Sequence, residues 1–168
     1  VALPSGAFAH SRRVDVRWQD RHVFSFSQSP WRACLYPLYT PSGIAVTSES
    51  PADHPHHNSV WIAADRVTAH LPFEGGVTEP ALYNFYVNDT FQGRAPGRIL
   101  AVGLTHRQID ASHLRLEQQL QWCGPPEWGA PQGRVIAHER RVVDLHCRQN
   151  RYVIDLCSHL RATDWQLT

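Results

Sequence analysis

Three histidines and one aspartate surround a single proline in the segment Asp53-His54-Pro55-His56-His57. Imidazole is the side chain most often used to bind metals or to transfer protons near neutral pH, and it is costly to bury without a partner. If the segment is extended, as Pro55 favours for the residue before it, His54 and His56 point to one face and His57 to the other. The segment therefore predicts a histidine site.

Three interpretations of this segment stay open. A divalent metal, most naturally zinc, would take His54 and His56 as ligands and would need at least a third one. The residues that the chain offers as that third ligand are His70, His106, Glu139 and His159. In a metal-free site the imidazoles would act as general acid and base or would bind substrate. In a purely structural loop, Asp53 would fix one histidine tautomer and no chemistry would follow.

Aromatic and charged side chains near the segment are predicted to hold a ligand. The predicted substrate-binding residues are Arg32, Trp61, Tyr83, Tyr86 and Glu139, and Tyr36 is predicted to join Asp53 and the histidines in the catalytic group. Aromatic rings stack well on the C–H faces of sugars, although core packing explains such residues equally. Arg32 or Arg66 would bind a carboxylate. Glu139 is an inward carboxylate if the strands alternate regularly, or else it pairs with Arg140 or Arg141 at the surface.

The elements that must position these residues are predicted to be strands. "RRVDVRWQD" and "HVFSFSQS" predict a first hairpin, and "WRACLYPLYTPSGIAV" predicts two short strands joined by a turn at Pro41-Ser42-Gly43. Residues 71–98 are rich in proline, glycine and aromatic residues, which is typical of a long functional loop. We therefore expect one wall of the site to come from this segment.

From Arg98 onward the pattern predicts a meander of antiparallel strands. The apolar residues Leu114, Leu116, Leu120 and Trp122 share one parity, with Gln118 as the exception, and residues 148–151 are the predicted turn of a final hairpin. No stretch has the pattern of an amphipathic helix. The sequence thus predicts an all-β protein, an antiparallel β-sandwich that comprises residues 1–168 as one domain or as the N-terminal part of one.

Composition narrows the class of partner. The chain has 168 residues, of which 42% are hydrophobic and 18% charged, with a formal net charge of +1. This balance provides no overall field for nucleic acid or for an anionic membrane, and no apolar run approaches the roughly 18 residues of a membrane span. The four cysteines form no CxxC pair, which favours reduced thiols and a cytoplasmic location.

The stretch "CLYPLYTPSGIAVTSESPADHPHHNSVWIA" resembles the family catalogued as PmoA-like, with its YLYPL, DHPHH and LWF pattern. "GRVIAHERRV" and "VIDLCSHLRA" are similar to the central strands of that family, so the resemblance extends from about Pro30 to the C-terminus. It implies a β-sandwich of the galactose-mutarotase type, often found among sugar-degrading genes. It also implies that Tyr36, Asp53, His54, His56 and His57 form the site.

Two departures from the family pattern affect that expectation. Ala63, Ala64 and Asp65 stand where the family has a His-Gly-Asp loop, and the family continues with further strands after the position of Thr168. We therefore expect a second chain to continue the fold after Thr168, as in a heteromer made by cleavage of one precursor.

These observations predict an enzyme, a hydrolase or lyase, acting on a carbohydrate-like or polyhydroxylated small molecule through the histidine cluster. One alternative is a non-catalytic β-sandwich subunit that binds a glycan or a partner. Another is the N-terminal chain of a self-processed heteromeric hydrolase.

Overall fold

The computed structural model describes residues 12–168, which form three β-sheets and the loops that connect their strands. The first sheet contains β1 (Arg12–Trp18), β2 (Arg21–Gln28) and β3 (Ala33–Leu38), in the order β1-β2-β3. Its strands are antiparallel, and β1 and β2 form the predicted first hairpin. Bulges in both pairs shift the register, which lets Val23 and Phe24 be buried although they are adjacent.

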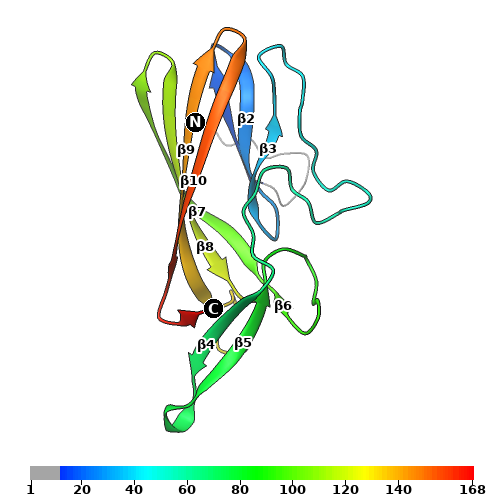
Figure 1. The fold of residues 1–168 in the computed structure, drawn as a ribbon, viewed down its shortest axis with the longest axis vertical. Helices are drawn as coiled ribbons and strands as arrows, with labels where there is room; N and C mark the ends of the chain where they lie inside the picture. The colour runs from blue at the N-terminus through cyan, green and yellow to red at the C-terminus, as the bar shows by residue number, and fades with distance from the viewer. Residues whose placement is uncertain (1–11) are drawn as a thin grey trace.

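The second sheet is the meander predicted from Arg98 onward. It contains β7 (Arg98–Asp110), β8 (His113–Cys123), β9 (Val135–Arg148) and β10 (Arg151–Ala162), in the order β10-β9-β8-β7. All neighbours are antiparallel, and the predicted final turn is confirmed because Arg148 pairs with Arg151. These long strands run along the longest axis of the molecule (Figure 1).

The third sheet lies at the end of the molecule opposite the β9–β10 turn (Figure 1). It contains β4 (Val67–Pro72), β5 (Thr78–Asn84), β6 (Ala95–Pro96) and β11 (Gln166–Leu167), in the order β11-β4-β5-β6, with only β5 and β6 parallel. A short 3₁₀ turn, Glu74–Gly76, joins β4 to β5. The interpretation of residues 71–98 as one long loop was therefore wrong. Pro80 is tolerated in β5 because β6 pairs only with Tyr83 and Asn84, so β4 is the single neighbour of Pro80.

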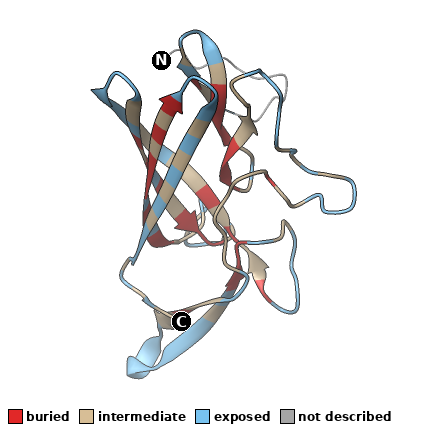
Figure 2. Cartoon of the chain, turned by 45° about the horizontal axis from the view of Figure 1, so that its top comes forward, coloured by how far each residue is buried: buried red, intermediate tan, exposed pale blue. Residues whose placement is uncertain are grey.

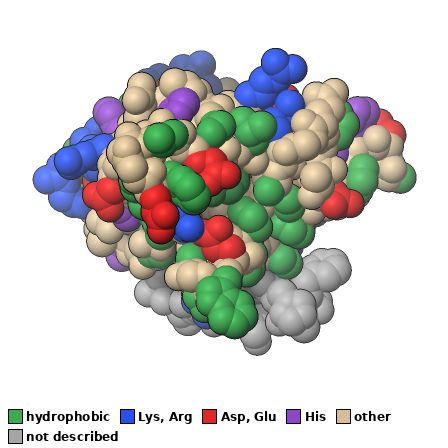
Figure 3. All heavy atoms as spheres, turned by 90° about the horizontal axis from the view of Figure 1, so that it is seen from below, with side chains coloured by type: hydrophobic (Ala, Val, Ile, Leu, Met, Phe, Trp, Pro, Cys, Tyr) green, Lys and Arg blue, Asp and Glu red, His purple; other side chains and the backbone are tan. Residues whose placement is uncertain are grey.

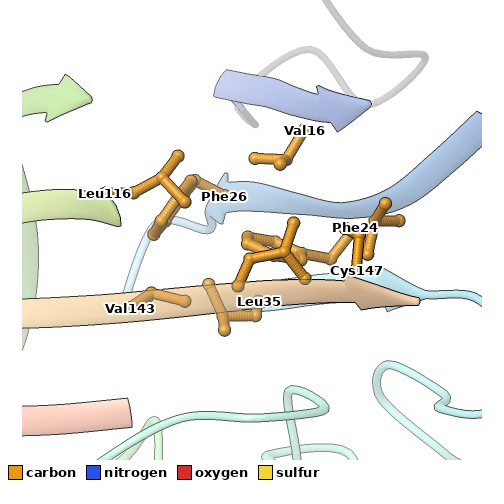
Figure 4. Close-up of a cluster of buried hydrophobic side chains, with 9 residues drawn as sticks. Val16, Phe24, Phe26, Leu35, Leu116, Val143 and Cys147 are labelled. Carbon is orange, nitrogen blue, oxygen red and sulfur yellow. The ribbon is translucent and has the colours of Figure 1, made fainter. Parts of the chain in front are cut away.

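Two apolar clusters hold the sheets together face to face. The first joins β1–β3 to the β8–β9 side of the meander, and Figure 4 shows its members Val16, Phe24, Phe26, Leu35, Leu116, Val143 and Cys147. The second joins the third sheet to the other end of the meander through Ala69, Tyr83, Phe85, Ile99, Leu120, Trp122 and Ile136. Most buried residues accordingly lie on strand segments that face another sheet, whereas the loop after β3 is exposed or half-buried except at Asn58 (Figure 2). The predicted all-β sandwich is confirmed for residues 12–168, and no sheet closes into a barrel.

A buried polar group interrupts the apolar interior. Glu139 has a fully buried side chain and accepts hydrogen bonds from Arg141 Nε at 2.8 Å and Ser158 Oγ at 2.9 Å. Its other oxygen accepts the indole N–H of Trp122 at 2.8 Å. The inward position predicted for Glu139 is confirmed, and its ion pair with Arg141 lies in the interior rather than at the surface.

The surface carries both signs of charge without a dominant one. Figure 3, seen from the end that bears the third sheet, shows acidic side chains near the centre of this face and basic ones mainly along its left and upper edges. Among residues 12–168, no helix has the length and apolar character needed to cross a bilayer.

Candidate functional site

The histidine segment lies in the long connection between β3 and β4, and it folds as two consecutive turns. His54 N–H donates to Pro51 O at 3.0 Å, and His57 N–H donates to His54 O at 2.9 Å. Ser50 N–H donates to His57 O at 2.7 Å and closes the base of the loop. The prediction of an extended segment was wrong, because Pro55 occupies the second position of a turn, which its fixed φ favours.

This fold brings all three imidazole rings together. His54 and His57 stack with centroids 4.7 Å apart and planes 17° apart, and His56 packs edge-on against His57 at 4.6 Å. The centroids of His54 and His56 are 5.9 Å apart. The prediction that His57 faces away from the other two was therefore wrong. We call His54, His56 and His57 the histidine cluster.

Asp53 orients one ring of the cluster. Its carboxylate Oδ2 lies 3.1 Å from His54 Nδ1, and this hydrogen bond from His54 is the main reason why the pKa of Asp53 lies below its ordinary value. With the proton held at Nδ1, neutral His54 exposes Nε2 as an acceptor. This arrangement suits a general base whose side chain is half exposed.

Two aromatic residues extend the cluster into a wall. His57 Nε2 lies 3.0 Å from the hydroxyl of Tyr86, and the Tyr86 ring stacks on Trp61 with centroids 5.2 Å and planes 28° apart. Beside them lies an open hollow of about 550 Å³. Its lining residues include His57, Trp61, Tyr86, Thr47, Ser48 and Ser59. This volume and this mixture of rings and hydroxyls fit a small polyhydroxylated molecule.

Arg32, immediately before β3, holds the base of the wall in place. Its guanidinium lies 4.4 Å from the centroid of the Trp61 ring and donates to His56 O at 3.2 Å and Tyr86 O at 2.6 Å. It also hydrogen-bonds to Asn88. Burial lowers the pKa of Arg32 to about 10, and no carboxylate of the described residues lies within ion-pair distance. Arg32 therefore joins the loop after β3 to the loop after β5.

The remaining predicted site residues lie outside this group of contacts. Tyr36 is half-buried on β3, and the Arg13 guanidinium lies 5.4 Å from the centre of its ring. Tyr83 is only 5% exposed and belongs to the second apolar cluster. Glu139 is bonded to Trp122 and Arg141 in the interior, away from the histidine cluster. Arg66 is exposed just before β4.

The four residues considered as a third metal ligand are spread over three strands of the meander and one strand of the third sheet. His70 on β4 contacts Thr168 at 3.2 Å, and His159 on β10 contacts Cys157 at 3.4 Å. His106 is exposed on β7, and Glu139 is on β9. Within residues 12–168, no three His, Cys, Asp or Glu side chains are arranged to hold a metal ion. The donor set therefore does not fit zinc as it stands, and the zinc site stays a prediction.

Two asparagines support the site although no sequence pattern indicated this role. Asn58 Nδ2 donates to His56 O at 2.6 Å, and Asn88 binds Arg32. Both hold backbone or guanidinium groups in place, which is a role that short polar residues in loops have without any characteristic spacing. Only the three-dimensional contacts reveal it.

The histidine cluster is expected to make stability depend on pH. Partial burial, followed by the neighbouring His57, His54 and Arg32, holds the pKa of His56 below its ordinary 6.5. The unfolded chain then binds more protons than the folded one as the pH falls through 6.5, so the free energy of unfolding decreases there. Urea unfolding at about pH 7.5 and about pH 5.5 should show this decrease in the wild type and a smaller one in His56→Leu. Equal decreases in both proteins would contradict the assignment of this pH dependence to His56. Asp53 does not contribute between these two pH values, because its pKa lies below 3.8 in the folded chain.

A family model matches residues 13–168, nearly all of the described chain. The chain belongs to this family. It is described as "Family of unknown function (DUF6807)", and the match includes both turns of the histidine segment and every strand except the first residue of β1. No curated protein and no solved structure matches the chain. The DUF6807 assignment thus gives the chain relatives but leaves its activity to be inferred from the site.

Proposed function

We propose that this DUF6807 member is an enzyme, a hydrolase or lyase, that acts on a carbohydrate-like or polyhydroxylated small molecule. The observation that carries the proposal is the convergence of three imidazoles, one of them oriented by Asp53, at the edge of a hollow that His57 lines together with Trp61 and Tyr86. The resemblance to the PmoA-like family, whose members are often found among sugar-degrading genes, supports the same substrate class.

The chain's own residues supply acid–base chemistry without any step through a metal. His54, with Nδ1 bonded to Asp53, accepts at Nε2 a proton from the substrate or from an attacking water. The pair of His57 and the Tyr86 hydroxyl, 3.0 Å apart, holds a proton that can be donated to the departing or developing oxygen. Trp61 offers an aromatic face against which the C–H side of a sugar ring packs.

The test is turnover of a panel of glycosides and sugar acids by the wild type and by matched histidine variants. His54→Gln and His57→Gln should lower turnover by about 10²–10⁴-fold, the usual contribution of a positioned acid or base. His159→Gln, which changes an exposed histidine on β10, is the control and should retain wild-type turnover. Equal turnover in all four proteins would refute the role of the cluster.

A glycan-binding module without catalysis is the second candidate, and the stacked pair of Trp61 and Tyr86 favours it. In that case no panel compound is turned over, and Tyr86→Ala weakens binding by about 1–3 kcal/mol while the histidine variants leave affinity nearly intact. Tyr86→Phe keeps the ring and removes the hydroxyl. It should bind like the wild type in a module but lose turnover in the enzyme.

A further inference from the structure

A second cavity, of about 430 Å³, opens between the first sheet and the meander. Val14 on β1 and Phe26 on β2 line one side, and Ala101 and Leu104 on β7 line the other. It shares no lining residue with the hollow beside the histidine cluster. The proposed function therefore does not use it.

Gln118 on β8 also lines this cavity, and its side chain is not satisfied there. The residue is 3% exposed, and its carbonyl oxygen Oε1 has no hydrogen-bond partner. Alternate residues of β8 are buried, and Gln118 is the single polar side chain among them. A buried acceptor without a donor is destabilising, so Gln118 Oε1 would be stabilised by a hydrogen-bond donor from a bound ligand.

Arg141, directly opposite Gln118 across the β8–β9 pair, does not supply that donor. Its Nε is bonded to Glu139 and its Nη1 to Ala33 O, and Nη2 has no partner of its own. The guanidinium is therefore held toward Glu139 and the start of β3.

Two other polar residues line the cavity, and both are already bonded to the backbone: Ser27 Oγ donates to Tyr36 O, and the Gln28 amide donates to Ser29 O and accepts from Ala101 N–H. The rest of the lining is apolar apart from Arg12, which is exposed at the rim and is the single charged lining residue.

We propose that this cavity binds a small uncharged molecule that carries one hydroxyl group on an apolar body. The hydroxyl donates to Gln118 Oε1, and the body packs against Val14, Phe26 and Leu104. An acceptor group such as a carboxylate would meet the Gln118 oxygen unfavourably, and a pure hydrocarbon would leave that oxygen without a donor.

The test uses three probes of similar size, benzyl alcohol, toluene and benzoate, titrated into the isotope-labelled full chain and followed by amide chemical shifts. Benzyl alcohol should shift the amides of Phe26, Leu104 and Gln118, with a dissociation constant at least about tenfold lower than that of toluene. The amides of Trp61 and Tyr86 should not move. Absence of shifts around the cavity, or equal affinity for alcohol and hydrocarbon, would overturn the proposal. Tighter binding of benzoate would place recognition at Arg12 and would overturn it as well.

Two variants separate ligand recognition from folding. Gln118→Leu removes the buried carbonyl, so it should bind toluene at least as well as benzyl alcohol, reversing the preference of the wild type. Ala101→Leu keeps Gln118 and fills the cavity, so it should lose binding of both probes while keeping the amide spectrum of a folded protein. Retention of the wild-type alcohol preference in Gln118→Leu would refute the role of Gln118 even if the cavity is occupied.

Discussion

Replacing Glu139 with alanine is expected to lower the free energy of unfolding by about 3–5 kcal/mol, the usual result of removing one partner from a buried ion pair. The change leaves the fully buried Arg141 guanidinium without its carboxylate, and Trp122 Nε1 and Ser158 Oγ lose their acceptor. Urea unfolding with linear extrapolation measures the effect. The loss relative to the wild type should be the same at high salt as at low salt, because a buried pair is little screened.

The matched control is Glu117→Ala, which removes the carboxylate of a second glutamate–arginine pair on the same sheet. Glu117 and Arg140 are 2.6 Å apart at the surface, where water screens the pair and solvates whichever partner remains. Its effect should be far smaller than that of Glu139→Ala. A double replacement, Glu139→Leu with Arg141→Met, should recover much of the lost stability because no charge is left buried. Similar effects for the two single variants would show that the buried pair has no special role.

Replacing Arg32 with alanine is expected to lower the free energy of unfolding by about 2–4 kcal/mol and to disorganise the site. The guanidinium supplies charged donors to the backbone oxygens of His56 and Tyr86 and to Asn88. His56 O keeps the donor of Asn58, but Tyr86 O and the Asn88 side chain lose theirs, and a buried acceptor left without a donor costs about 1–3 kcal/mol. Relief of the desolvation that lowers the pKa of Arg32 to about 10 offsets part of this loss. Urea unfolding and the ring chemical shifts of the histidine cluster are the measurements.

Arg66→Ala is the control for Arg32→Ala. Arg66 is exposed in the same connection between β3 and β4, and a surface substitution of this kind usually changes stability by less than about 0.5 kcal/mol. Its histidine shifts should match those of the wild type. An Arg32→Ala protein with wild-type stability and unchanged histidine shifts would show that Arg32 does not hold the two loops together.

The strands of the meander were predictable because alternation is a local property. Leu116, Leu120 and Trp122 repeat at a period of two, and the same parity is buried in β8. The β4–β5 hairpin was missed for an equally local reason, since Pro80 and the two glycines of the 3₁₀ turn interrupt the pattern. The partners of each strand depend on contacts between distant residues, and local pattern does not encode them.

The histidine cluster shows the same division. The residue types in Asp53-His54-Pro55-His56-His57 predicted a site, and that site stays a prediction. Trp61 and Tyr86 were predicted to bind a ligand; Tyr86 packs on His56 and Trp61, and the ligand-binding role of both stays a prediction. Which way each ring points was not predictable from period-two geometry, because turns rather than a strand set the side-chain directions. The supporting contacts of Arg32 join residues 24 and 54 positions away in the chain.

The sequence by itself determined the all-β class, the final hairpin turn and the chemical character of the histidine segment. These follow from alternation, turn residues and side-chain type, all of which act over a few residues. Tertiary structure alone decided that Glu139 and Arg141 pair in the interior, that Tyr83 lies in the core while Tyr86 faces the cluster, and that Gln118 lines a cavity. Each of these depends on how sheets pack, and burial is a property of the assembled sandwich rather than of any one strand.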